Sequence, residues 1–376
     1  MSVTRASKHP IANWWFRIDR LSVVLVFSIL FIGCLVLLTA SSAVSGKYGV
    51  DVWYFAKRQV MFLGLCVPFM VMVSTLTLQR LKLLCSILVL VSIGGVFLTL
   101  FVGEGVKGAT RWIHIGGFKL QPSEFLKPSL VMLTAWLFSV KEPEIFRRNF
   151  VVSLGIMAVI AILLLLQPNF GMLLVLGGVW CVQVFLAGYP FMWLAGLAGV
   201  GVLVIIGAYF GLSHVQSRID RFLDPSSGDA YQVEQGLEAL MSGGFIGRGP
   251  GEGVVKHSLP DAHTDFIFAV IGEEFGLIAC CLLLVLYGAF LYRSFALLLQ
   301  NEDRFTLLAG TGLIVLFGAQ VLINTGVVLH LLPTTGVTLP FISYGGSSTF
   351  AMAIMVGLIL ALTRKGDRYG ARHPRD

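Results

Sequence analysis

Residues Leu259–Gly276 read LPDAHTDFIFAVIGEEFG, a polar turn that passes directly into an apolar run. The turn contains His263 and Asp265, and the run contains the adjacent carboxylates Glu273 and Glu274. A charge inside a membrane-spanning helix costs about 2.5–3.5 kcal/mol on insertion scales, so such a residue normally has a function or a buried partner. The stretch therefore predicts polar chemistry at the boundary of a membrane-embedded helix.

The composition of the whole chain is that of a polytopic membrane protein. Of its 376 residues, 56% are hydrophobic and 12% are charged, and the mean hydropathy is +0.86. A soluble domain carries about 25% charged residues. Apolar runs of about 17–25 residues can each cross a bilayer as a helix. They predict an all-α fold of about ten transmembrane helices, near residues 21–43, 54–74, 81–101, 123–139, 151–166, 171–188, 191–210, 266–298, 305–328 and 346–362.

The distribution of Lys and Arg predicts the orientation of these helices. The larger share of basic residues falls in the termini and in one set of short loops, which the positive-inside rule places in the cytoplasm. We predict a cytoplasmic segment 1–20, a transmembrane domain 21–362 and a cytoplasmic basic tail 363–376. The long polar insertion at 211–264 is then an extracytoplasmic loop. A polar lead precedes the first span without a cleavage site, so we do not expect a signal peptide.

Motifs for common cofactors are missing from the sequence. There is no P-loop, no dinucleotide-binding fingerprint and no His-Glu-x-x-His zinc motif. The six cysteines lie in apolar runs without metal-ligand spacing, which is typical of small core residues.

Asp265 stands immediately before an apolar run, where two roles are open. Thr264 or Asp265 could cap the helix that follows. A partly desolvated carboxylate beside His263 could instead serve as a general base. The two roles are compatible, and we favour the catalytic one.

Glu273 and Glu274 do not form a paired-carboxylate site with Asp265. On a continuous helix Glu273 lies about 12 Å from Asp265 along the axis, and Glu274 points to the opposite side. The carboxyl groups of glycosidases lie about 5–9.5 Å apart. We expect both glutamates to be buried partners of basic groups or of the backbone, with a proton or ion path as the alternative.

A second polar stretch, KGATRWIHIGGFKLQPSEFLK, covers residues 107–127. Arg111 and Trp112 offer a cation and an aromatic ring on the outer face. Glu124 lies in the first turn of a predicted helix and can pair with Lys127 at the i,i+3 spacing. Either this pair is self-satisfied, or Arg111 and Lys127 together bind a pyrophosphate.

A third stretch, LPTTGVTLPFISYGGSS at residues 332–348, interrupts the apolar pattern before the last span. Irregular backbone at membrane depth is tolerated where it is buried in protein or lines a cavity. The stretch is either a re-entrant loop without chemistry or a cavity wall in which Ser343 and Tyr344 bind polar headgroups.

The segments KGATRWI, QPSEFLKP, LPDAHTDFIFAVIGEEFG and LPFISYGGSS together resemble the signature segments of the SEDS family (shape, elongation, division and sporulation). The resemblance covers the membrane domain in order, and it is closer to the division type than to the elongation type. It implies a ten-span fold and a peptidoglycan glycosyltransferase that polymerises lipid II on the outer face of the cytoplasmic membrane. The essential aspartate of the family falls on Asp265, and its other motif residues on Arg111, Trp112, Glu124 and Lys127.

The resemblance also implies partners and a location. They are lipid II, the growing glycan-lipid, a class B penicillin-binding transpeptidase (FtsI-like) and other divisome membrane proteins, in the bacterial inner membrane at the septum, without nucleic acid. The sequence indicates no particular cofactor, although a divalent cation, Mg or Mn, could assist beside Asp265. The alternatives are a lipid II flippase, an elongation-type polymerase and a divisome scaffold without chemistry.

Overall fold

The computed structural model describes residues 10–106, 109–223 and 231–364. Every apolar run predicted from the sequence is a helix, which confirms the all-α class. These helices are α2 (Arg20–Tyr48), α3 (Tyr54–Thr75), α4 (Leu78–Val102), α5 (Pro122–Phe138), α6 (Pro143–Leu166), α7 (Phe170–Leu186), α8 (Phe191–Gly211), α11 (Ile267–Leu298), α12 (Arg304–Val328) and α13 (Gly346–Leu362). A short helix, α1 (Pro10–Arg17), precedes them.

Seven of these helices are long and apolar enough to cross a membrane. Two more, α7 and α13, are apolar but have only 17 residues each. Helix α5 is equally short and carries Glu124 and Lys127. The polytopic membrane arrangement is therefore confirmed, and the number of spans stays a prediction.

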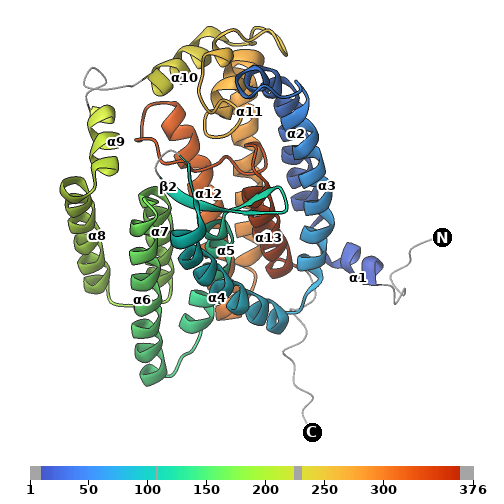
Figure 1. The fold of residues 1–376 in the computed structure, drawn as a ribbon. Coiled ribbons are helices and arrows are strands. Elements are labelled where there is room, and N and C mark those ends of the chain that lie inside the picture. The colour runs from blue at the N-terminus through green and yellow to red at the C-terminus, as the bar shows by residue number, and fades with distance from the viewer. Residues whose placement is uncertain (1–9, 107–108, 224–230, 365–376) are drawn as a thin grey trace.

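Helix α13 lies in the middle of the bundle and α8 at its edge (Figure 1). Nearly every residue of α13 is buried, and the helix packs on α3, α5 and α12. A helix that is apolar all round is expected in such a place. Helix α8 packs mainly on α7 and on α9 (Ser213–Leu223) and exposes most of its apolar side chains.

The two ends of the described chain lie on the same side of the bundle. The Trp14 indole Nε1 donates to Ser74 Oγ at 2.7 Å, and Arg364 Nη2 donates to the Leu76 carbonyl at 2.8 Å. Both acceptors stand at the end of α3. This agrees with termini on one face of the membrane, and the positive-inside prediction makes that face cytoplasmic.

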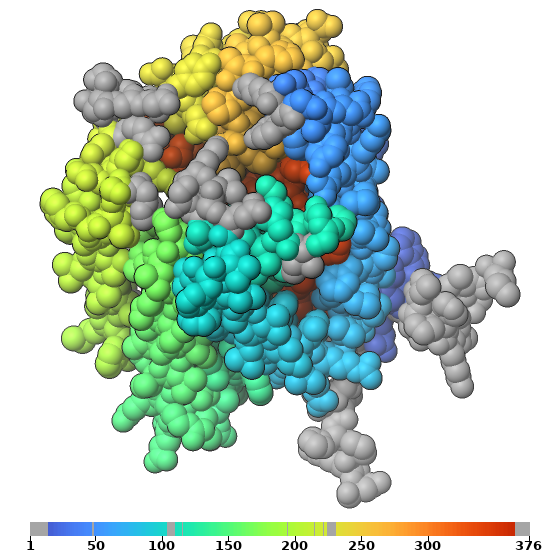
Figure 2. Space-filling view, in the orientation of Figure 1, coloured from blue at the N-terminus to red at the C-terminus, as the bar shows by residue number. Residues whose placement is uncertain are grey.

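A small antiparallel sheet lies between α4 and α5, where the sequence analysis expected a loop. Its strands are β1 (Glu104–Val106), β2 (Ala109–Ile115) and β3 (Phe118–Leu120), in the order β1-β2-β3. Ile115 pairs with Phe118, so Gly116 and Gly117 form a two-residue hairpin turn with φ of 56° and 81°. Glycine suits such a turn because it adopts positive φ without strain. In the space-filling view, orange and red atoms of the last third of the chain are visible beside the sheet (Figure 2).

Helix α11 is broken at Gly276, where φ is 78° and ψ is 179°. The helix predicted near 266–298 is present, but the sequence analysis did not predict this break. The break separates a short buried segment, which contains Glu273 and Glu274, from a longer helix of spanning length. The distance of about 12 Å expected between Asp265 and Glu273 assumed an unbroken helix from Asp265 onward, whereas the helix begins at Ile267.

The glycine-rich part of the outer loop satisfies the backbone groups that this break leaves open. The Leu277 and Ile278 amides donate to the Gly244 and Phe245 carbonyls at 2.9 and 3.2 Å. In the other direction, the Arg248 and Gly249 amides donate to the carbonyls of Glu273 and Glu274 at 2.9 and 3.0 Å. Buried backbone groups need such partners. The outer loop, which also contains α10 (Tyr231–Ser242) and the 3-10 turn η2 (Val255–His257), is thus fastened directly to α11.

Candidate active site

The polar turn that ends at Asp265 is not held by helix capping. Phe266 occupies the N-cap position of α11 and makes no side-chain cap hydrogen bond. The amides of Thr264 and Phe266 donate instead to the Asp261 carbonyl at 3.0 and 3.3 Å. Phe266, and neither Thr264 nor Asp265, therefore stands at the N-cap position of α11.

Three successive carbonyls of the turn are fixed by the loop before α13 and by α12. The Tyr344 amide donates to the His263 carbonyl at 2.8 Å, and Ser343 Oγ donates to the Thr264 carbonyl at 2.7 Å. Asn324 Nδ2 donates to the Asp265 carbonyl at 2.9 Å. These contacts hold the backbone of the turn in one place, which is what a positioned general base requires.

Ser343 has a structural role in place of the headgroup contact predicted for it. Its hydroxyl donates to the turn and also accepts from the Leu339 amide at 2.8 Å. The side chain is buried. Tyr344, by contrast, lies at the surface of a cavity.

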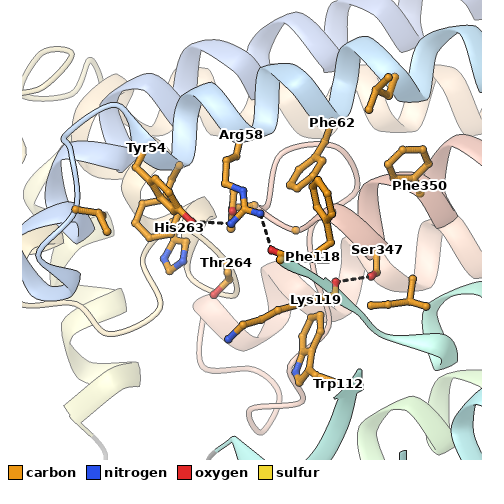
Figure 3. A pocket seen from close by; sticks show the side chains of 18 of the residues that line it. Tyr54, Arg58, Phe62, Trp112, Phe118, Lys119, His263, Thr264, Ser347 and Phe350 are labelled. Atoms are coloured by element: carbon orange, nitrogen blue, oxygen red, sulfur yellow. Dashed lines mark hydrogen bonds between the residues drawn. The ribbon is translucent and has the colours of Figure 1, made fainter. Parts of the chain in front are cut away.

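That cavity has a volume of about 700 Å³ and lies between α3, the sheet, the polar turn that ends at Asp265 and the start of α13 (Figure 3). Ligand pockets commonly measure about 300–1,000 Å³ and combine aromatic walls with a few polar groups. Most of the lining side chains are aromatic, with Arg58 and Lys119 as the cations; they include Tyr54, Phe55, Phe62, Trp112, Phe118, Phe125, His263, Thr264, Tyr344 and Phe350. The cavity is suited to a polar ligand with flat or ring-shaped parts.

Arg58, which the sequence analysis did not single out, is held in this cavity by two hydrogen bonds and three aromatic rings. Its guanidinium donates to the Tyr54 hydroxyl at 2.6 Å and to the Gly117 carbonyl at 3.1 Å. It also lies 5.4, 6.0 and 5.6 Å from the ring centres of Tyr54, Phe62 and Phe118. Figure 3 shows it between Tyr54 and Phe62, facing the turn with His263 and Thr264. Neutral partners position the guanidinium without cancelling its charge.

His263 lines the same cavity and is largely buried in aromatic contacts. Its ring centre lies 4.7 Å from that of Phe55 and 5.5 Å from that of Tyr344. The structure thus brings His263, Tyr344 and Trp112 to one cavity from three separate stretches of the sequence, and their contact with substrate stays a prediction.

Arg111 lies in a different environment from its neighbour Trp112, because successive residues of a strand point to opposite faces. Its Nε donates to the Gln167 carbonyl at 3.2 Å, and its Nη2 donates to the Pro168 carbonyl. Burial is the main cause that lowers the pKa of Arg111 to about 10; the positive charge of Arg218 also lowers it, and the negative charge of Asp265 opposes the shift. Arg111 and Asp265 are therefore close enough to interact electrostatically.

The loop before α13 passes beside the Asp265 carboxylate. A Cβ atom at Gly336, where φ is 74°, would lie 3.8 Å from Asp265 Oδ2. The carboxylate therefore faces this loop. The aromatic cavity begins at the preceding residues of the turn, His263 and Thr264.

Glu124 and Lys127 form a buried ion pair. Their charged atoms lie 2.8 Å apart, and their side chains are only 8% and 3% exposed. Lys127 Nζ also donates to Gln320 Oε1 at 2.8 Å. Of the two interpretations left open by the sequence, the structure favours the self-satisfied pair, and a contact of Glu124 or Lys127 with substrate stays a prediction.

Glu273 and Glu274 have the buried partners that were expected of them. The amides of Val254, Val255 and Lys256 donate to the Glu273 carboxylate at 2.7, 2.7 and 2.9 Å. Lys256 Nζ pairs with Glu274, and both side chains are fully buried. The same Nζ donates to the Gly251 carbonyl at 3.1 Å. This cluster of Lys256, Glu273 and Glu274 ties the outer loop to the segment that follows Asp265.

Comparison with known proteins agrees with this geometry. Residues 19–367 match the model of the FtsW/RodA/SpoVE family, described as cell cycle proteins. The chain belongs to this family.

Relatives within the FtsW/RodA/SpoVE family match along almost their whole length. The probable peptidoglycan glycosyltransferase FtsW of Caulobacter vibrioides is 36% identical over 98% of this chain and 95% of that protein. Stage V sporulation protein E of Bacillus subtilis is 35% identical over 92% of this chain and 97% of that protein.

Solved structures of the family have the same fold. A chain of a peptidoglycan synthase complex that coordinates polymerisation and crosslinking superposes with a TM-score of 0.76, at 30% identity over 94% of this chain and 98% of that chain. The rod-shape-determining protein RodA of Thermus thermophilus superposes with a TM-score of 0.69, at 30% identity over 94% of this chain and 99% of that chain.

Among the residues that the structure describes, no group of three or more His, Cys, Asp or Glu side chains could hold a metal ion. A cation such as Mg²⁺ is often bound by one or two carboxylates together with substrate phosphates. The divalent cation that the sequence analysis allowed beside Asp265 therefore stays a prediction.

Proposed function

We propose that this chain is a peptidoglycan glycosyltransferase that polymerises lipid II into β-1,4 glycan strands during septal wall synthesis. The observation that carries the proposal is the rigidly held turn that ends at Asp265: its residues His263 and Thr264 line an aromatic cavity of about 700 Å³, and the Asp265 carboxylate interacts with Arg111. Relatives named probable peptidoglycan glycosyltransferase FtsW support the reaction class.

In the proposed mechanism Asp265 acts as the general base. Its carboxylate removes the proton from the 4-hydroxyl of the GlcNAc of an incoming lipid II, at a distance of about 2.6–3.2 Å. The oxygen attacks the anomeric carbon of the MurNAc at the end of the growing chain. The bond between that carbon and the pyrophosphate oxygen breaks, and undecaprenyl pyrophosphate leaves. A single displacement inverts the anomeric centre and forms the β-1,4 link.

The aromatic cavity would hold the sugars of lipid II. Trp112 and Tyr344 offer flat apolar faces for sugar rings, and Arg58 and Lys119 offer charge for phosphate. The lipid tails would lie along apolar helix surfaces, since the reaction takes place at the membrane boundary.

We further propose a class B penicillin-binding transpeptidase of the FtsI type as partner, within a larger set of divisome membrane proteins. The structural similarity to a chain of a peptidoglycan synthase complex supports a partnered enzyme. The location is the inner membrane at the septum, as expected for relatives named FtsW.

A flippase is the competing function, and the buried carboxylates were its main support. Glu273 accepts three amides and Glu274 is paired with Lys256, so both are fixed in place by the outer loop. An ion path needs carboxylates that can bind and release the transported ion. The geometry therefore favours the polymerase.

The experiment that separates these functions uses the purified chain with its transpeptidase partner in proteoliposomes that contain labelled lipid II. The polymerase produces long glycan strands without an ion gradient. Movement of label across the bilayer without any glycan product would instead support the flippase.

A further inference from the structure

The end of α10 and the glycine-rich turn after it present large apolar side chains away from the protein. Phe245 is 72% exposed, Ile246 is 80% exposed, and Met241, in the last turn of α10, is 73% exposed. Single exposed apolar residues are normal on a protein surface, whereas several large ones close together usually mark an interaction surface. We call these three side chains the apolar edge of the outer loop.

The turn that carries the apolar edge lies directly on the backbone of α11. An added Cβ at Gly243 would collide with the Gly272 carbonyl oxygen, and one at Gly247 with the carbonyl oxygen of Glu274. Glycine at both positions therefore lets the two backbones touch. The hydrogen bonds already described between this turn and α11 pair backbone groups of both segments, as contact with lipid requires.

The apolar edge continues a row of exposed apolar side chains on α11. Leu277, Ile278, Leu282 and Val285 follow the break at Gly276 and are all exposed. Helix α11 is a candidate membrane span, so exposed apolar side chains along it face lipid. The Ile278 amide donates to the Phe245 carbonyl at 3.2 Å, which places the edge beside the first residues of this row.

The length of α11 gives the depth of the apolar edge in the membrane. Arg293 on this helix pairs at 2.6 Å with Asp19, the N-cap of α2, and charged residues flank a span at its cytoplasmic boundary. Leu277 precedes Arg293 by 16 residues, which is about 24 Å of helix. The hydrocarbon core of a bilayer is about 30 Å thick. The edge therefore lies just inside the outer boundary of that core, at the depth where interfacial apolar side chains insert.

Helix α2 gives a second measure of this depth. Lys256 Nζ, in the same outer loop, donates to the Thr39 carbonyl at 3.5 Å. Thr39 follows Asp19 by 20 residues, which is about 30 Å of helix. The outer loop thus descends to the outer boundary of the hydrocarbon core. The exposed Arg248 beside the edge carries the charge that suits lipid phosphates at this level.

We propose that the apolar edge inserts among the acyl chains of the outer leaflet and anchors the outer loop in the membrane. Lipid is the occupant because the edge continues the lipid-facing row of α11 and lies at hydrocarbon depth. The turn that carries the edge is bonded to the carbonyls of Glu273 and Glu274, so the anchor also holds the helix segment after Asp265 at one depth. This membrane contact does not depend on the proposed function.

The test places the photoreactive residue p-benzoylphenylalanine at Phe245 or Ile246 of the full chain. Each variant is reconstituted in vesicles of phosphatidylethanolamine and phosphatidylglycerol, alone and with the transpeptidase partner, then irradiated, and its adducts are identified by mass spectrometry. The same substitution at Val285, on the lipid-facing row, is the positive control, and at the exposed Glu234 of α10 the negative control. We expect about tenfold more phospholipid adduct at Phe245 and Ile246 than at Glu234, since acyl chains surround only the former.

Phospholipid adduct that persists when the partner is present supports the anchor. Adduct with the transpeptidase in place of lipid would overturn it and make the edge a protein interface, and a yield equal to that at Glu234 would overturn it as well.

A second measurement serves if the photoreactive variants do not fold. Phe245→Trp is compared with wild type in vesicles whose lipids carry bromine on their acyl chains, which quenches tryptophan fluorescence on contact. The fluorescence that the variant adds should be quenched by these lipids and should be protected from iodide in the water. Quenching of the added fluorescence by iodide alone would overturn the anchor.

Discussion

Replacement of Lys256 by Met tests whether the buried charge cluster holds the outer loop on α11. The side chains of Lys256 and Glu274 are both 0% exposed. Removal of the lysine therefore leaves a buried carboxylate without its counter-charge, which costs about 3–5 kcal/mol. The Met backbone amide can still donate to Glu273, so the expected loss is specific to the charge.

The double variant Lys256→Met/Glu274→Gln removes both charges at once. We expect its cost to fall to about 1–2 kcal/mol, because a neutral buried amide requires much less compensation than a carboxylate. Lys57→Met is the matched control: its ion pair with Asp51 joins side chains that are 71% and 56% exposed, so it should change stability by less than about 1 kcal/mol.

The assay is reversible unfolding in mixed micelles with increasing SDS, followed by tryptophan fluorescence. We expect the wild type to be the most stable, the double variant to be intermediate and Lys256→Met to be the least stable. A single variant as stable as wild type, or a double variant less stable than the single one, would refute it.

Three further perturbations follow from the geometry. Gly276→Ala should lower the free energy of unfolding by about 3 kcal/mol or more in the same assay. The reason is that φ is 78° and the new Cβ would lie 2.4 Å from a backbone oxygen. The control Gly288→Ala should be neutral or stabilising, because its new Cβ would have no atom within 4 Å. The bond from Arg293 is the main cause that lowers the pKa of Asp19 from 3.8 to about 2. The Asp19 carboxylate therefore contributes about 1–2 kcal/mol, after solvent screening, to the free energy of unfolding above pH 3.8, and this contribution is lost as the pH falls to 2. The difference in stability between wild type and Asp19→Asn should vanish over that range. Arg58→Gln should raise the KM for lipid II about tenfold with a smaller change in kcat, since one charged contact to bound substrate is lost; an unchanged KM would exclude Arg58 from the substrate site.

Hydrophobicity alone predicted the helices well, because a lipid environment demands long apolar runs and allows little else. The same criterion missed the break at Gly276. A single glycine in an apolar run is an ambiguous signal. Its left-handed conformation depends on carbonyls of the outer loop, which are distant in sequence from α11 before folding.

The candidate site was predicted only in part. Asp265 and His263 stood out because polar residues bordered an apolar run. The hairpin with Trp112 and Arg111 had a local signal, Gly116-Gly117 between two alternating stretches, that could have been recognised. Lys256 and Arg218 had none: each is a single basic residue in the long outer segment, and only tertiary packing places Lys256 beside Glu274 and Arg218 beside the Thr334 carbonyl.

The central claim is that Asp265 removes the proton from the attacking sugar hydroxyl, and one measurement tests it most directly. Purified Asp265→Asn, with its transpeptidase partner, is given lipid II, and the initial rate of strand formation is compared with that of wild type. The account predicts a rate lower by about 10²–10⁴-fold, with lipid II binding retained, because the amide cannot accept the proton. Strand formation at the wild-type rate would contradict it.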